Sequence, residues 1–477
     1  MATQGADLQG HGDRGPAASP APLRGAAAFA LVATLVLGVI SYQLNASMVT
    51  PALPDMAGRL GGGMGEISRV SSLFFLAGSV AGVVFTRYSD FIGRRRTLLL
   101  VLGAACAGTL ICVLAPNMPV LLLGRVLQGA ASAAFQMAYV ILHERLDAKG
   151  FATSLGAVTA INGGVAGVDG YVGGMLSDAF GFRAIFGVTL LTGVVAAVCV
   201  ARFVPDSDRS PAAGRMDWWG AAALAAVLIG VTNFISNGSS EGWGSPVSLA
   251  YLVATAVACY GFHRIESRRE SPLIAVRHLK SRQVWPVVAT TVVTLSAVFA
   301  VMNFTIVVIS QDDALGFGLS AADSALLFLV PAALIGLISA PLAGWLAASQ
   351  GWFRILHAGM VLTLGSLVVL AVFPLDQWVA FAAVAMLGVS YNGLFMAGIH
   401  GLSVLLSPEE APAALPGING AAYGIGASVG TTIVAPFVAQ ETAGGYATAL
   451  WIAVAVAALA LATSLFIAPP RGRTTTM

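Results

Sequence analysis

The stretch MPVLLLGRVLQGAASAAFQMAYVIL, residues 118–142, decides the fold because it is long and apolar and contains a single charge, Arg125. A helix crosses the roughly 30 Å hydrocarbon core of a bilayer with about 20 apolar residues. A charged side chain inside such a run is costly in lipid, so it faces the protein interior and is a functional candidate. The stretch therefore predicts a membrane-spanning helix with Arg125 turned inward.

The composition of the whole chain agrees with this local reading. Of 477 residues, 57% are hydrophobic and only 10% are charged, whereas soluble domains carry about 25% charged residues. This composition excludes a soluble protein and a disordered one. Strands with open edges are excluded as well, because their unpaired backbone groups would have no hydrogen-bond partner in lipid. We expect an all-α integral membrane protein with fourteen spans, at 26–50, 67–87, 97–115, 118–142, 151–176, 183–203, 217–236, 246–264, 284–310, 321–347, 353–374, 377–405, 413–438 and 443–468.

The basic residues give the expected orientation. If the N-terminus is cytoplasmic, 20 of the 24 Lys and Arg residues fall in cytoplasmic tails and loops, and only Arg59, Arg69 and Arg183 fall outside. The positive-inside rule predicts such a bias for the correct topology. We therefore expect a multi-pass protein of the cell membrane with both termini in the cytoplasm.

Two loops resemble each other. Residues 86–96 read TRYSDFIGRRR and residues 344–354 read GWLAASQGWFR, with a glycine at the eighth position of each and a basic residue beyond it. Repeats of this kind place a substrate site between two related halves. The expected organisation is a disordered cytoplasmic tail (1–24), a six-helix half (25–205), two inserted helices (206–270), a second six-helix half (271–470) and a cytoplasmic tail (471–477).

Three motifs carry a family resemblance. They are the span-4 motif LGRVLQGA at 123–130 with Arg125, Gln128 and Gly129, the loop DFIGRR at 90–95 with Asp90, Gly93, Arg94 and Arg95, and PLIAVR at 272–277. At these residues the sequence resembles the major facilitator superfamily, and more narrowly its 14-span drug:proton antiporter branch. The resemblance covers about residues 25–470. It implies a major-facilitator-like bundle of 14 transmembrane helices, a gating role for the loop, and a monomer.

Two departures from that branch bear on mechanism. In span 1 the sequence LNASMVTPALP at 44–54 has Asn45 where the branch usually has an aspartate, and asparagine carries no proton. In span 5 the motif reads DGYVGG, with Asp169, Gly170, Gly173 and Gly174, and lacks the usual proline. Asn45 cannot serve as the proton-coupling residue of span 1, so we expect proton coupling at Asp169 and Arg125 instead.

Arg125 and Asp169 are the only charges well inside the expected spans. Arg125 precedes Arg145 by the same number of residues as Asp169 follows Lys149, and spans 4 and 5 are joined by a short loop. At about 1.5 Å rise per residue the two charges then lie at similar depth. We expect them to approach each other or to share a water-filled cavity. The alternative is a structural ion pair without a transport role.

Neutral polar residues recur on one face of several spans, and as a set they predict a polar central cavity. Each one alone could equally be an interhelical packing contact. The expected substrate-binding residues are Tyr42, Asn45, Gln136, Tyr139, Asn162, Asn303, Tyr391, Asn392 and Tyr423. His400 is a further, weaker candidate for proton relay.

The function expected from the resemblance is secondary active transport, with proton-coupled export of amphipathic organic compounds by alternating access. The alternative is a facilitator or uptake carrier for a specific small metabolite, which the altered motifs favour. The sequence contains no phosphate-binding Gly-Lys-Ser/Thr loop and no Cys/His cluster, so we expect no cofactor, no metal and no enzyme activity. Expected partners are a small-molecule substrate, protons and membrane lipids, and no nucleic acid.

Overall fold

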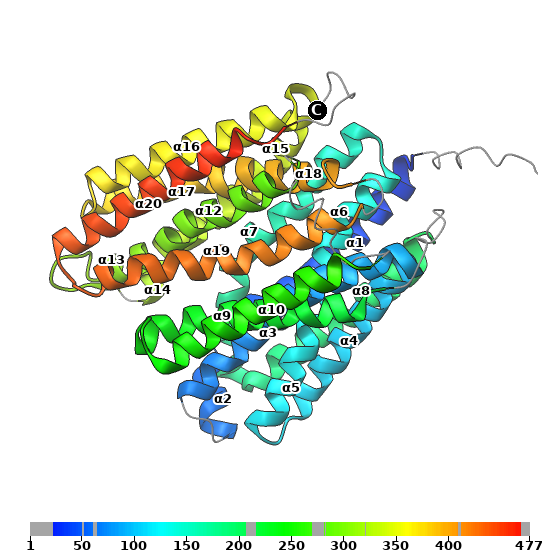
Figure 1. Cartoon of the computed structure of the whole chain (residues 1–477), viewed down its shortest axis with the longest axis horizontal. Coiled ribbons are helices and arrows are strands. Elements are labelled where there is room, and N and C mark those ends of the chain that lie inside the picture. The colour runs from blue at the N-terminus through cyan, green and yellow to red at the C-terminus, as the bar shows by residue number, and fades with distance from the viewer. Residues whose placement is uncertain are drawn as a thin grey trace, which may run out of the picture.

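The computed structural model describes residues 22–49, 52–60, 64–206, 216–269, 281, 283–319, 321–408 and 412–468, and every regular element in these ranges is a helix (Figure 1). Most of both expected tails, and the 272–277 motif, lie outside the described residues. The elements, with η marking π-helical turns, are α1 (Gly25–Ser47), α2 (Leu53–Leu60), α3 (Met64–Ile92), α4 (Arg94–Leu114), α5 (Met118–Gly129), α6 (Ser132–Arg145), α7 (Ala148–Phe180), α8 (Phe182–Phe203), α9 (Trp218–Glu241), α10 (Pro246–Glu266), α12 (Trp285–Ala300), η2 (Val301–Thr305), α13 (Ile306–Gln311), α14 (Ala321–Ser324), η3 (Ala325–Leu329), α15 (Val330–Gln350), α16 (Trp352–Val372), α17 (Gln377–Leu387), η4 (Gly388–Phe395), α18 (Met396–Leu405), α19 (Ala414–Val438) and α20 (Ala443–Ser464).

Thirteen helices in the described part are long and apolar enough to cross a membrane, which confirms an all-α membrane protein. Helix α7 has 33 residues and is not among the thirteen, but it packs against α1 and α15. The expected span 118–142 is divided into α5 and α6 by a short break at residues 130 and 131.

Polar side chains at the N-termini explain where several helices begin. Asn117 accepts a hydrogen bond from the backbone N–H of Val120 at the start of α5, and Asp147 does the same for Gly150 at the start of α7. A cap of this kind satisfies one of the N–H groups that lack a partner in the first turn. These two polar side chains therefore mark where α5 and α7 begin.

Two sets of helices make up the bundle. We call α1–α8 the N-terminal set and α12–α20 the C-terminal set (Figure 1). The sets meet where α7 packs on α15, α3 on α19, and α6 on α18. We call the end of the bundle where α1 begins and α20 ends the terminal end, and the opposite end, which carries α2 and the α13–α14 connection, the far end.

The α9–α10 pair packs beside both sets. Helix α9 contacts α3 and α19, and a small apolar cluster joins Met216, Ala221 and Leu228 to Val83 and Ala421. Only 11% of the apolar window of α10 is buried, against 67% for the window spanning α5 and α6. Helix α10 is therefore peripheral, and α5 and α6 lie in the interior of the bundle.

Tight turns of one type connect successive helices in both sets. Gly93 has φ 95° and ψ 150°, and Gly351 has φ 89° and ψ 146°, so the two glycines aligned by the sequence repeat share one backbone conformation. Gly181, between α7 and α8, is similar at φ 79°. Such positive φ values favour glycine because it lacks a Cβ atom. The turn between α19 and α20 is longer, at residues 439–442, and contains Glu441 with φ 49°.

Three π-helical turns interrupt helices, and in the described chain all three belong to the C-terminal set. They are η2, η3 and η4, of which η4 extends over eight residues, Gly388–Phe395. A π-helical turn widens a helix and displaces its side chains, and such turns recur at functional sites. The apolar pattern of the sequence does not predict them.

Candidate functional site

A cluster of hydrogen-bonded side chains joins the two sets near the terminal end. His400 on α18 is 4% exposed, and its Nδ1 lies 2.8 Å from the hydroxyl of Tyr139 on α6. Its Nε2 lies 2.8 Å from the hydroxyl of Tyr423 on α19. Thr159 on α7 lies 3.0 Å from the Tyr139 hydroxyl. One imidazole thus connects helices of both sets through both of its nitrogens.

One assignment of donors is consistent with the hydrogen bonds of this cluster. The Tyr423 hydroxyl donates to Sδ of Met396, an atom that can only accept. The Tyr423 oxygen therefore accepts from Nε2–H of His400, and the neutral ring then presents Nδ1 as an acceptor to Tyr139. Thr159 completes the chain by donating to the Tyr139 oxygen. Opening of the bundle at this end would break the Tyr139–His400 bond, since it crosses between the sets.

An aromatic row continues from this cluster into the N-terminal set. Phe135 packs edge-on against Tyr139, with 4.9 Å between ring centroids, and it contacts Tyr42 at 6.5 Å. Tyr42 stacks on Phe74 at 5.8 Å, and the Arg125 guanidinium lies over Phe74 at 4.3 Å. Tyr42 and Tyr423 remain half-buried. The row links the expected charge at Arg125 to the His400 cluster.

Arg125 is fully buried and its contacts are mainly with oxygen atoms of the N-terminal set. Its Nε donates to the carbonyl of Val70 at 2.8 Å, and its Nη1 donates to the carbonyl of Asn45 at 2.9 Å and to Oε1 of Gln128 at 2.8 Å. Gln128 in turn donates to Thr109. Nη2 has no hydrogen-bond partner. The guanidinium therefore fixes α1, α3 and α5 to one another.

The carboxylate of Asp169 binds a residue other than Arg125. It is 3% exposed, and its Oδ2 accepts a 2.5 Å hydrogen bond from Ser47, the last residue of α1. Its Oδ1 has no hydrogen-bond partner. Within the described chain no ion pair joins Asp169 to Arg125, so the direct contact between them is absent here. The two charges instead touch the same end of α1, at Ser47 and at the carbonyl of Asn45.

The span-4 and span-5 glycines lie at close helix crossings. A Cβ atom on Gly129 would lie 2.7 Å from Cβ of Ala77 on α3, and one on Gly173 would collide with the Met48 carbonyl after α1. Gly170 has open space around it. These motif residues therefore bring α3 and α1 close to the two charged side chains.

The other expected substrate-binding residues do not join one site. Tyr391 stacks on Phe395 within η4, and Asn392 donates to the Ala332 carbonyl at 3.3 Å. Asn303 is exposed on η2. The side chain of Asn162 lies outside the described residues. Asn45 uses its Nδ2 on the carbonyl of Ser41, in its own helix. Of the expected set, Tyr139 and Tyr423 meet at His400, with Gln136 and Tyr42 nearby on α6 and α1.

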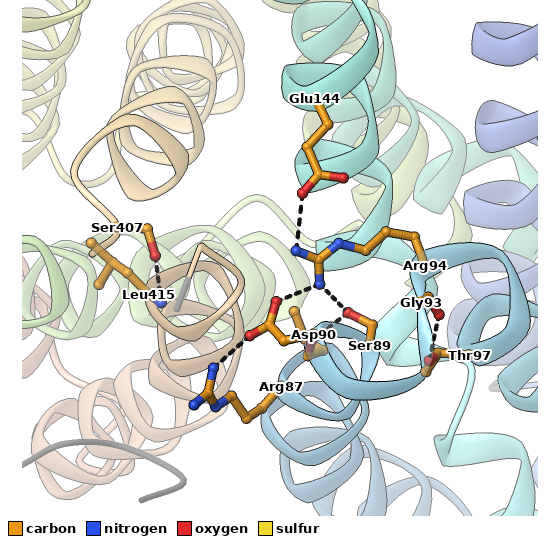
Figure 2. A network of polar contacts seen from close by, with 10 residues as sticks. Arg87, Ser89, Asp90, Gly93, Arg94, Thr97, Glu144, Ser407 and Leu415 are labelled. Carbon is orange, nitrogen blue, oxygen red and sulfur yellow. Dashed lines mark hydrogen bonds and ion pairs between the residues drawn. The ribbon is translucent and has the colours of Figure 1, made fainter. Parts of the chain in front are cut away.

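A charged network occupies the terminal end of the N-terminal set (Figure 2). Asp90 forms ion pairs with Arg87 at 2.7 Å and with Arg94 at 2.6 Å, and Arg94 also reaches Glu144 at the end of α6, at 3.0 Å. Arg94 donates in addition to Ser89. The network ties α3 and α4 to α6, and the start of α19 lies beside it in Figure 2.

Arg95 and Gly93 complete the loop motif. Arg95 is half-buried, donates to the Ala201 carbonyl of α8 and pairs with Asp206 at 3.1 Å. Gly93 provides the turn that places Arg94 on the buried side. Sequence reasoning found Asp90 and Arg94 but missed Arg87 and Glu144, although acids and bases at the ends of neighbouring spans are a visible signal. It also missed Ser47, Thr159 and Met396, which no sequence pattern distinguishes from ordinary helix residues.

The comparisons with known proteins agree with this architecture. The family description that matches residues 35–431 is the Major Facilitator Superfamily. A curated relative, the uridine/deoxyuridine transporter of Lactococcus lactis subsp. cremoris, is 33% identical over 426 residues, covering 87% of this chain and 88% of the relative. The chain belongs to the Major Facilitator Superfamily. It is a multi-pass membrane transporter, and not an enzyme.

Further relatives and solved structures are more distant. The multidrug resistance protein Stp of Mycobacterium tuberculosis is 26% identical over 83% of this chain and 73% of the relative, and the tetracenomycin C resistance and export protein of Streptomyces glaucescens is 24% identical over 85% and 75%. Two solved structures share the fold. The human organic anion transporter MFSD10 has a TM-score of 0.66 and 12% identity, and the match covers 92% of this chain and 99% of that one. A proton:xylose symporter has a TM-score of 0.61 and 13% identity, and the match covers 91% of this chain and 94% of that one.

Proposed function

We propose that this chain carries a small polar solute with an aromatic ring, of the nucleoside class, across the cell membrane by alternating access. The observation that carries the proposal is the His400 cluster, in which Tyr139 and Tyr423 of the two sets meet on one imidazole. Aromatic rings that are half-buried stack well on a planar base, and hydroxyl and imidazole groups bind its polar edge. The relative of similar length that transports uridine and deoxyuridine supports the same solute class.

The proposed topology has fourteen spans. Helix α7 is the fifth crossing, α9 and α10 (within 206–270) are inserted between six-helix halves at 25–205 and 271–470, and both termini are cytoplasmic. The length of α7 and the distribution of basic residues support this arrangement. The terminal end is then the cytoplasmic end, and the charged network around Arg94 and the His400 cluster close it. The protein is proposed to work as a monomer.

Proton coupling is proposed at Asp169. Its carboxyl group is buried, with one oxygen on Ser47 and the other without a hydrogen-bond partner. Helix α1 connects this group to Arg125, so a movement of α1 would change the surroundings of both. A carboxyl group whose surroundings alternate can take up a proton on one side and release it on the other. Arg125 is proposed as the fixed cation that holds α1 in position.

The Asp169→Asn variant tests the coupling in proteoliposomes. We expect it to lose uridine accumulation driven by an imposed pH gradient and to keep uridine exchange between the two sides, because exchange needs binding and rocking without a proton. Asp313→Asn, at an exposed loop residue, is the control and should retain both activities. Gradient-driven accumulation in the Asp169→Asn variant would show that this acid does not couple transport.

Proton-coupled export of amphipathic compounds, as in drug or natural-product resistance, is the second candidate. The exporters among the relatives favour it, at 24–26% identity. The two functions differ in solute and in direction. Vesicles of both orientations, loaded with radiolabelled uridine or with a lipophilic cationic dye, separate them: uridine transport with no dye transport supports the first, and gradient-driven dye extrusion without uridine transport supports the second.

A further inference from the structure

Gln136 stands out among the buried amides of this protein. It lies on α6, is 9% exposed, and its Oε1 has no hydrogen-bond partner. Among the described residues its Nε2 has none either. Gln128 offers a direct contrast, because its Oε1 accepts from Arg125 and its Nε2 donates to Thr109. Asn419 is likewise bound, by Thr291 at 2.6 Å.

Buried amides that serve only as packing contacts are hydrogen-bonded, since an unmatched polar group is costly away from water. Gln128 and Asn419 fit that role. Gln136 does not, and its amide therefore retains its N–H donors and its carbonyl acceptor for a partner outside the protein. The sequence singled out Gln136 only as one of many polar residues.

The surroundings of Gln136 belong to both sets of helices. A Cβ atom on Gly420 of α19 would collide with Nε2 of Gln136, so the absence of a side chain at this glycine makes room for the amide. Tyr139 lies three residues along α6, on the side that bonds His400. Phe135, the neighbouring residue of α6, contacts both the Tyr139 and the His400 rings. The amide thus lies at a contact between the sets, on the same helix as Phe135 and Tyr139.

The chemistry of an amide defines what it can bind. It presents a donor and an acceptor next to each other in one plane, and it pairs through two hydrogen bonds with a group that presents an acceptor and a donor in the same way. The lactam or imide edge of a heterocyclic ring is such a group, and the flat ring would be accommodated by the neighbouring aromatic side chains. A hydroxyl group carries its donor and its acceptor on one atom, so it does not match the separate N–H and carbonyl of the amide.

We propose that Gln136 reads the imide edge of the solute ring, the N–H and adjacent carbonyl of a uracil-type base, with the His400 cluster lying on the terminal side of the bound ring. The inference rests on the proposed function and deepens it, because it assigns the base-recognition residue. A site built to bond an N–H group strongly rejects an analogue that lacks it, since the site's own polar groups are then left unpaired.

The test compares two solutes and three proteins. Binding of uridine and of N3-methyluridine, in which a methyl group replaces the imide hydrogen, is measured on detergent-purified wild type, Gln136→Met and Gln440→Met by displacement of radiolabelled uridine and by the thermal shift. Gln136→Met keeps the length of the side chain and removes both hydrogen-bonding groups. Gln440, which is exposed at the end of α19, is the control. Melting of the unliganded variants verifies that they are folded.

We expect wild type and Gln440→Met to prefer uridine over N3-methyluridine at least tenfold, which corresponds to about 1.4 kcal/mol. Gln136→Met should bind uridine more weakly and lose most of the preference. If Gln136→Met is folded, binds uridine and keeps the preference, the assignment of Gln136 is wrong while the nucleoside function stands. If Gln136→Met does not fold, Gln136→Asn replaces it, and an unchanged preference in that shorter amide equally overturns the assignment. If wild type binds no nucleoside, the proposed function itself fails, and this inference with it.

Discussion

Glu441 is the one described non-glycine residue with a positive φ, 49°. It occupies the four-residue turn between α19 and α20. A side chain in this conformation costs roughly 1 kcal/mol, because Cβ crowds the backbone. We expect Glu441→Gly to raise the stability of the protein by about 1 kcal/mol or less, since glycine also loses more backbone entropy on folding. Thermal unfolding in detergent measures this.

Glu441→Ala is the control for that substitution, because it removes the carboxylate and keeps Cβ. It should leave the melting temperature close to that of wild type. Equal stabilisation by alanine and glycine would assign the effect to the charge and contradict the conformational explanation.

Single residues also mark how far sequence reasoning reaches. Arg125 and Asp169 could be recognised because a charge stands out in an apolar run. Their hydrogen-bond partners could not be recognised in this way. Arg125 binds the backbone carbonyls of Val70 and Asn45, and every residue has a backbone carbonyl. The expected contact between the two charges rested on depth alone. Equal depth places two residues in one layer of a bundle but does not say which helix lies between them, and here α1 touches both.

Close crossing of α7 and α15 is the main element-level contact between the sets. A Cβ atom on Gly344 would collide with the Ala152 carbonyl, and one on Gly156 would lie 2.7 Å from Cα of Pro341. Glycine at these positions lets the helix backbones touch. We expect Gly344→Val to separate the terminal ends of α7 and α15 and to shift the protein toward the state open at that end.

Spin labels at Lys149 and Gln350, both exposed, can measure the shift as a longer component in the distance distribution. Gly365→Val on α16 is the matched control, because a Cβ atom there meets nothing within 4 Å. An unchanged distribution in Gly344→Val would mean that the crossing tolerates a side chain and does not set the closed state.

The two repeated loops show what an element-level pattern can and cannot predict. The repeat correctly aligned Gly93 with Gly351, whose backbones match. The residues that follow have diverged: Arg94 reaches Glu144 through an ion pair, whereas the ring of Trp352 lies so close to Gly401 that a Cβ atom there would collide with it. The fold of the turn depends on glycine and is visible in the sequence. The contact that holds the turn in place is made with distant helices, so the sequence does not reveal it.

At the scale of the whole molecule, fourteen expected apolar stretches were enough to predict an all-helical membrane protein, because the bilayer fixes helix length. The way in which the sets meet was beyond reach, as Tyr139 and His400 are 261 residues apart. The break between α5 and α6 and the π-helical turns were also missed, since both are local departures from a helix that apolar content alone does not reveal. These departures lie on helices that line the contact between the sets or adjoin it.

Alternating access requires the sets to separate at the terminal end, and a cross-link there tests this directly. Cβ of Thr86 on α3 lies 3.5 Å from the position of a Cβ atom on Gly417 of α19, within the range for a disulfide. In a background without the native cysteines, we expect oxidation of Thr86→Cys/Gly417→Cys to abolish solute transport and dithiothreitol to restore it. The control pair is Gly193→Cys with Cys106 restored as the one native cysteine, and it lies inside the N-terminal set, where Sγ of Cys106 is 2.9 Å from a Cβ atom at position 193. Its oxidation should leave transport intact. Undiminished transport through a fully formed α3–α19 disulfide would mean that the solute crosses without separation of these two helices.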